Sequence, residues 1–130
     1  MRGTVYKSTG SWHSVKNNDG VEFQCRIKGK IRLDNIQSTN PVAVGDIVEF
    51  ELENDTDSRN GIINEVFDRK NYILRKSVNL SKQTQILAVN IDYLFLVITI
   101  NNPVTTTNFI DRFLISSNAY SIDTILLFNK

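Results

Sequence analysis

The chain has 130 residues, of which 41% are hydrophobic and 22% are charged, and this balance supports a packed core and excludes an intrinsically disordered protein. The formal net charge is +1, so any attraction to nucleic acid would depend on where the Lys and Arg residues lie rather than on bulk charge. The single cysteine excludes an internal disulfide, no signal sequence is present, and the longest apolar stretch, 93–100, is too short to cross a bilayer, which together predict a cytoplasmic protein.

Residues 1–68 have the pattern of an all-β unit. Turn signals at residues 8–10 and at the Asp19-Gly20 pair, a strong hairpin sequence, separate the first short strands. Residues 21–33 then alternate between apolar side chains on one face and polar or charged side chains on the other. Gly29 falls on the apolar face, which indicates a bulge or a sharp bend.

Two further stretches, 43–52 and 62–67, have strand character and are separated by a polar loop. About five short strands with turn signals between them predict a small closed barrel, and the OB fold is the common arrangement for that number of strands. We therefore expect an all-β, OB-type five-stranded barrel over residues 1–68. Cys25 alternates with Phe23 and Ile27 on the apolar face, and we expect it to be an inert core thiol.

The chain changes character after the predicted barrel. Residues 69–85 are polar and basic, and this composition predicts a basic connection between two units. Residues 86–100 are almost continuously apolar and rich in β-branched side chains, which predicts one strand that is covered on both faces.

A helix and a second strand are predicted next. Thr105, Thr106 and Thr107 offer N-caps, and the apolar residues that follow recur at helical spacing. Residues 123–130, DTILLFNK, predict another buried strand. A strand, a helix and a strand joined by short connections form one βαβ unit with a parallel pair. Such a unit cannot cover its own sheet, so we expect residues 86–130 to be the start of an incomplete α/β domain.

The last two residues, Asn129 and Lys130, directly follow the core of this predicted strand. Ligands of α/β domains bind at the carboxyl ends of parallel strands, and P-loop GTPases carry there an Asn-Lys-x-Asp motif that contacts guanine. The other interpretation is that a polar pair keeps the strand end in solution. The sequence contains no G-x-x-x-x-G-K-[ST] phosphate loop. A base-reading motif placed first, after a β-barrel, would require a circularly permuted GTPase.

Six segments together resemble the ribosome small-subunit-dependent GTPase A family, also called RsgA or YjeQ. They are CRIKGKIRL, PVAVGDIVEFEL, GIINEVFDRKNYILRKS, ILAVNID, FIDRFLISSNAY and the terminal FNK, and the resemblance covers essentially the whole chain. Val89, Tyr93 and Asp123 depart from the family pattern without removing a phosphate or base ligand. The resemblance implies an N-terminal OB domain, a circularly permuted P-loop GTPase domain of which residues 86–130 are the first βαβ unit, and a C-terminal zinc domain beyond Lys130.

The resemblance also implies a function. The intact protein would bind and hydrolyse GTP with Mg²⁺, carry Zn²⁺ in its absent C-terminal domain, and act as a cytoplasmic monomer on the small ribosomal subunit late in its maturation. Asn129 and Lys130 would be the first half of the guanine-binding motif. These 130 residues contain no catalytic constellation and no metal ligand set, so we expect the chain alone neither to hydrolyse GTP nor to bind it measurably.

Basic side chains are the candidate contacts to ribosomal RNA. One group lies on the polar face of the predicted strand 21–33 and another lies in the connection, where phosphate contacts would be salt-sensitive and independent of sequence. The candidates are Arg26, Lys28, Lys30, Arg32, Arg69, Arg75 and Lys76. The other interpretation is a charged outer face and a solvated linker that bind nothing.

Two neighbouring residues are weaker candidates. Trp12 could stack on a base, but we expect it to pack in the barrel. His13 is the only histidine, which excludes a histidine-based zinc cluster or triad within this chain. Two further functions stay open from the sequence alone: a stand-alone OB-type nucleic-acid-binding module without nucleotide chemistry, and a barrel that contacts ribosomal proteins only.

Overall fold

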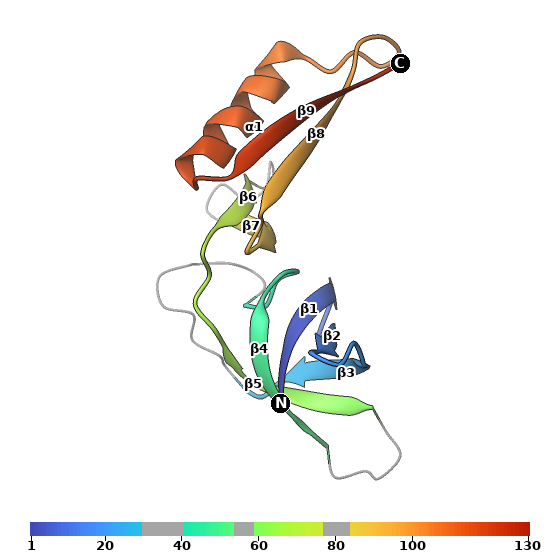
Figure 1. Ribbon diagram of the computed structural model, residues 1–130, viewed down its shortest axis with the longest axis vertical. Coiled ribbons are helices and arrows are strands. Elements are labelled where there is room, and N and C mark those ends of the chain that lie inside the picture. The colour runs from blue at the N-terminus through green and yellow to red at the C-terminus, as the bar shows by residue number, and fades with distance from the viewer. Residues whose placement is uncertain (30–40, 54–58, 77–83) are drawn as a thin grey trace.

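A computed structural model of the chain describes residues 1–29, 41–53, 59–76 and 84–130. In Figure 1 the barrel, coloured blue to green, lies at one end of the molecule, a unit of two strands and a helix, coloured orange to red, lies at the other, and two short strands lie between them. No helix within the described ranges has the length and apolar character of a membrane span.

The predicted OB-type barrel is confirmed. Its strands are β1 (Arg2–Thr9), β2 (Trp12–Asn17), β3 (Glu22–Ile27), β4 (Ile47–Leu52) and β5 (Asn60–Val66), and they close in the order β1-β2-β3-β5-β4. All neighbouring pairs are antiparallel except β3 and β5, which run parallel. Eight buried side chains, which include Phe23, Cys25, Phe50 and Ile63, fill the interior.

The predicted turn between β2 and β3 forms through local hydrogen bonds. Gly20 has a φ of +79°, and its amide donates to the Asn17 carbonyl at 3.0 Å. The Asn17 side-chain oxygen accepts from the amide of Val21 at 2.9 Å. Within the described residues the expected alternation reaches Ile27, where β3 ends, and residues 30–33 of the predicted strand lie outside the described part of the chain. Gly29 has a φ of +66° beyond the end of β3 rather than in a bulge within it.

The basic connection predicted for residues 69–85 contains paired strands. β6 (Tyr72–Lys76) pairs antiparallel with β7 (Thr84–Val89) to form a two-stranded sheet. Its apolar side chains pack in a small second core of Ala43, Ile86 and Val89, with Tyr72 and Leu74 against it. The basic composition of residues 69–85 predicted a connection without strands, because the apolar side chains that pack here are interspersed with charged residues.

The prediction of one strand over residues 86–100 is wrong. The apolar run is divided into β7 and β8 (Tyr93–Thr99) by a turn in which Asn90 has a φ of +53°. The Asn71 side chain fixes this turn, because its oxygen accepts from the Ile91 amide at 2.6 Å and its nitrogen donates to the Ile91 carbonyl at 2.7 Å. Asn90 and Asp92 are therefore turn residues, and only the segment after them, β8, pairs with the last strand of the chain.

The predicted βαβ unit is confirmed. Helix α1 (Thr107–Ala119) has Thr106 as its N-cap, whose side chain accepts from the Phe109 amide, and β9 (Asp123–Asn129) pairs parallel with β8. The helix lies along this two-stranded sheet (Figure 1). Leu96 and Ile98 are buried, but Phe95 and Val97 are each 56% exposed, so β8 is covered on one face and not on both as predicted.

The loop before β4 joins the barrel to the β6–β7 hairpin. The Val89 amide donates to the Val44 carbonyl at 2.9 Å, and the Asn90 side chain donates to the Gly45 carbonyl at 2.9 Å. The other side of the same loop is bonded to β1, because the Gly45 amide donates to the Val5 carbonyl at 2.8 Å. We call these contacts, made by residues 43–46 with 89–90, the joint.

Candidate functional site

Asn129 and Lys130 lie where the sequence predicts them, at the carboxyl end of β9. Asn129 is the last residue of the strand and is in register with Thr99, the last residue of the parallel strand β8. The chain that leaves Thr99 is held close to this end, because the Thr105 amide donates to the Thr99 carbonyl at 2.8 Å and the Thr105 hydroxyl accepts from the Thr99 amide at 2.9 Å. Both Asn129 and Lys130 are exposed, so their polar groups are free to meet a ligand at this edge.

The basic face of the barrel is described in part. Arg26 lies on β3 with its side chain 54% exposed and forms an ion pair with Glu53. Lys28 is exposed just after β3, and its amide donates to the Ile63 carbonyl at 3.2 Å, which keeps this stretch against β5. Lys30 and Arg32 lie outside the described residues. Arg26 and Lys28 are therefore both exposed near the end of β3, with the charge of Arg26 partly neutralised.

The candidates in the connection lie in different environments. Arg75 is exposed on β6, and Lys76 ends that strand, although its side chain lies outside the described part of the chain. Arg69 has an inward side chain that is only 7% exposed. An RNA backbone cannot reach a guanidinium in this position, so Arg69 is a structural residue and we exclude it from the candidate surface.

Arg69 forms a bidentate ion pair with Asp46, and the Asp46 side chain is fully buried. Its Nε donates to Asp46 Oδ1 at 2.7 Å and its terminal nitrogen donates to Oδ2 at 2.6 Å. The same terminal nitrogen donates to the Pro41 carbonyl at 3.1 Å, and Asp46 Oδ2 also accepts from the Ala43 amide at 2.8 Å. The pair thus fixes the loop of the joint against the segment that leads from the barrel to β6.

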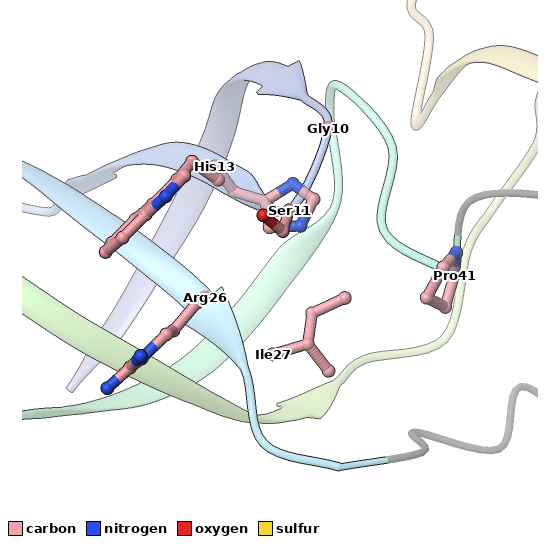
Figure 2. Close-up of a pocket in the computed structure, with 7 residues that line it drawn as sticks. Gly10, Ser11, His13, Arg26, Ile27 and Pro41 are labelled. Carbon is pink, nitrogen blue, oxygen red and sulfur yellow. The ribbon is translucent and has the colours of Figure 1, made fainter.

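The prediction that Trp12 packs in the barrel is wrong, and its neighbour His13, for which no placement was predicted, is the buried residue of the two. The Trp12 side chain is 43% exposed, whereas His13 is 2% exposed, so the indole is not part of the barrel core. β2 pairs with both β1 and β3, and the alternation of its side chains directs His13 inward and Trp12 outward. Both residues border a cavity at the β1–β2 turn, where Figure 2 shows His13 and Ser11 on one side and Pro41 across from them.

The remaining titratable candidate, Cys25, is a core residue as predicted. Its side chain is fully buried, and this burial raises the pKa of the thiol to about 11, which keeps it protonated and unreactive at neutral pH. Within the described ranges, no group of three or more His, Cys, Asp or Glu side chains is arranged to hold a metal ion.

Two family models match the chain in succession. Residues 2–63 match the RsgA N-terminal domain and residues 66–130 match the RsgA GTPase domain. The first match covers the barrel as far as the middle of β5, and the second covers the β6–β7 hairpin and the βαβ unit.

Individual relatives agree with these matches. The chain is 62% identical over all 130 residues to the small ribosomal subunit biogenesis GTPase RsgA of Flavobacterium psychrophilum and to that of Christiangramia forsetii, and it spans 40% and 41% of their lengths. The crystal structure of YjeQ from Thermotoga maritima is similar over 99% of the chain and 41% of YjeQ, with 31% identity and a TM-score of 0.66. The structure of YloQ, a circularly permuted GTPase, is similar over 98% of the chain and 39% of YloQ, with 26% identity and a TM-score of 0.63.

Proposed function

The chain belongs to the RsgA family, and we propose on this basis that the whole protein is a GTPase that acts in the biogenesis of the small ribosomal subunit. The observation that carries the proposal is the match of residues 66–130 to the RsgA GTPase domain, directly after a barrel that matches the RsgA N-terminal domain. A stand-alone nucleic-acid-binding barrel would not be followed by such a segment. We further propose that the protein acts in the cytoplasm as a monomer.

The two ends of the described chain would have different tasks. We propose that residues 1–68 contact the small subunit and its RNA, that residues 69–85 are the connection, and that residues 86–130 begin the nucleotide-binding domain. Asn129 fits a guanine edge because its amide offers both a donor and an acceptor, and the stem of Lys130 could cover the base. Mg²⁺, and Zn²⁺ in a further domain, would be held by residues that the described ranges do not supply. Bound Mg²⁺ would neutralise the charge that develops on the phosphates.

Guanine recognition by Asn129 is tested by nucleotide binding and turnover. We expect the 130-residue chain to give no GTP hydrolysis above a mock preparation, because a phosphate-binding loop supplies most of the anchoring of a nucleotide. In the whole protein, Asn129→Ala should weaken GTP binding by on the order of tenfold, since one or two hydrogen bonds to the base are lost. Equilibrium titration with a fluorescent GTP analogue measures the affinity of the unsubstituted protein and of the Asn129→Ala variant for GTP.

The matched control for Asn129 is Asn118, which is exposed near the end of α1 and so lies on a different element from the strand end. Asn118→Ala should leave the affinity for GTP unchanged. Equal affinity of the Asn129→Ala and unsubstituted proteins for GTP would remove Asn129 from the guanine site, and turnover by the 130-residue chain would overturn the proposed division of labour.

Binding to the ribosome is tested by co-sedimentation of the chain with purified small and large subunits over a series of salt concentrations. We expect binding to the small subunit only, weakening steeply with salt because phosphate contacts release counterions. Lys28→Glu should lower the affinity and flatten the salt dependence, since it removes one cation and adds a repulsive charge.

Arg112→Glu is the control for this experiment, because Arg112 is exposed on α1, outside the barrel, and the substitution changes the net charge equally. It should leave subunit binding close to that of the unsubstituted chain. If Lys28→Glu and Arg112→Glu have the same effect, net charge rather than the barrel face determines binding, and the proposed contact through Lys28 is wrong.

A further inference from the structure

A cavity of about 320 Å³ opens beside the β1–β2 turn of the barrel. Its described walls come from the start of β2, the end of β3 and Pro41, and Figure 2 shows Ile27 and Pro41 facing Ser11 and His13 across it. A volume of this size is at the lower end of the range for pockets that hold small molecules or single rings. The family membership assigns nothing to it.

Of the described residues that line this cavity, His13 carries buried polar atoms without a partner. The imidazole is 2% exposed, and neither ring nitrogen has a hydrogen-bond partner among the described residues. Leaving a buried polar group without a partner is unfavourable, so a ligand that brings a donor or an acceptor to the ring would relieve that cost. Burial lowers the pKa of His13, an effect that the nearby Asp46 carboxylate only partly offsets, so the ring is neutral at neutral pH and offers one donor and one acceptor.

Trp12 and Arg26 form a stacking platform at the mouth of the cavity. The Trp12 side chain is 43% exposed, and the guanidinium carbon of Arg26 lies 6.0 Å from the centre of its ring. Glu53 holds the guanidinium in place through an ion pair. Aromatic side chains in OB folds bind single-stranded nucleic acid by stacking on successive bases, and arginine adds a cation–π contribution.

The chemistry of the cavity favours a flat, partly polar ring over a free anion. Among the described residues that line it, the one cation, Arg26, is already paired with Glu53, which leaves little charge for a phosphate. Ile27 and Pro41 offer apolar contact, and His13 and Ser11 offer hydrogen bonds at one side, which together suit a heteroaromatic ring with a polar edge. A base in a duplex could not enter, because its faces and its pairing edge are occupied.

We propose that this cavity receives an unpaired nucleobase of RNA, which stacks on the Trp12–Arg26 platform and directs its polar edge toward His13 and Ser11. The proposal rests on the proposed contact between the barrel and ribosomal RNA and adds to it a site that reads the base rather than the phosphate. A contact between Lys28 and an RNA phosphate would position the RNA strand, and the cavity would select a base that is not paired in an RNA helix.

The fluorescence of Trp12 provides a direct test, because it is the only tryptophan of the chain. The 130-residue chain would be titrated with single-stranded RNA homopolymers of about ten nucleotides, within the site size of an OB fold, and with the same oligomers made abasic. We expect saturable quenching by at least one homopolymer and none by its abasic form. The variants without Trp12 would be tested with the same homopolymer carrying a fluorescent label, by fluorescence anisotropy. Trp12→Ala should weaken binding of this RNA about tenfold or more, and Trp12→Phe should restore part of the affinity.

Tyr6→Ala is the matched control. Tyr6 is 59% exposed on β1 and also has a cation over its ring, because Lys16 Nζ lies 4.8 Å from the ring centre, but it does not line the cavity. Its loss should leave the affinity for the homopolymer unchanged. His13→Phe, which keeps a ring of similar size, should reduce the difference in affinity among the four homopolymers more than it reduces the tightest binding.

The possible outcomes distinguish failure of the nucleobase site from failure of the proposed function. Equal binding of base-containing and abasic oligomers without quenching, or no quenching by any homopolymer, overturns the nucleobase site. If co-sedimentation with the small subunit persists in that case, the proposed function stands and rests on phosphate contacts alone. If Tyr6→Ala weakens binding as much as Trp12→Ala does, the effect is a general loss of surface aromatic area and the assignment to this cavity is wrong.

Discussion

Replacing Arg69 by alanine is expected to lower the free energy of unfolding by about 3–5 kcal/mol, because it leaves the fully buried Asp46 carboxylate without its charged partner. The remaining hydrogen bond from the Ala43 amide cannot compensate a buried charge. A domain of this size has a total stability of only about 5–15 kcal/mol, so the variant should be close to its unfolding threshold. Urea denaturation followed by the fluorescence of Trp12, which reports on the barrel, measures the change.

Lys70→Ala is the control for this prediction. Lys70 is the next residue and also forms an ion pair, with Asp92, but the two side chains are 53% and 76% exposed. An exposed pair contributes at most about 1 kcal/mol, so this variant should unfold almost like the unsubstituted chain. The double variant Asp46→Leu with Arg69→Met should be more stable than Arg69→Ala, because it removes both charges. An Arg69→Ala chain as stable as Lys70→Ala would contradict the structural role assigned to the pair.

Gly45→Ala is expected to cost about 3 kcal/mol or more. Gly45 has a φ of +94°, and an alanine there loses about 1–2 kcal/mol on conformation alone. The added methyl carbon would lie 3.0 Å from the carbonyl carbon of Val89 and closer still to its oxygen. Because a backbone group cannot rotate away, the joint must open, and the bonds from Val89 and Asn90 to the loop, about 1 kcal/mol each, are lost.

Gly20→Ala isolates the conformational part of that cost. Gly20 has a φ of +79°, and no atom lies within 4 Å of an added methyl group. We expect its loss to be no more than about 1–2 kcal/mol, measured in the same urea titrations. Equal losses at the two positions would show that the close approach of the joint contributes nothing, and the prediction for Gly45 would then be wrong.

The barrel was predictable because its information is local. Alternation along residues 21–27 and the Asp19-Gly20 turn predict the strand and the hairpin without reference to any long-range contact. The helix was predictable for the same reason, since Thr106 caps it and apolar residues such as Phe109, Phe113 and Leu114 recur at helical spacing. Asn129 could be placed at the end of β9 because the strand and its polar end are adjacent in the sequence.

The errors occur where a residue depends on a partner far along the chain. Arg69 lies in a basic stretch and resembled a phosphate contact, but Asp46, twenty-three residues before it, holds the guanidinium inside. The break in the run 86–100 depends on Asn71, whose side chain fixes the turn at Ile91. Neither partner has a sequence signature, because a single Asp in a Gly-Asp pair or a single Asn is ordinary in loops.

Trp12 and His13 show a different limit. Apolar character predicts burial on average, so the indole was assigned to the core and the imidazole was given no place there. The register of β2 between β1 and β3 instead places His13 inside the barrel and Trp12 outside. A shift of this register by one residue would exchange the two faces of the strand. The alternation of Val15 with His13 was the available signal, because Val15 is a core residue two positions along the same strand.

The closure of the barrel has a consequence for how the chain forms. β1, β2 and β3 pair as successive hairpins, but β4 must return to β1, and β5 must lie parallel to β3, before the barrel is shut. Contacts between segments so distant in the sequence slow folding. While the protein is being synthesised, the outer edge of β1 stays unpaired until β4 has emerged and the outer edge of β3 stays unpaired until β5 has emerged, and unpaired edges recruit strands of other chains. The interval between the synthesis of residue 27 and that of residue 66 is therefore when the nascent protein most needs protection from aggregation.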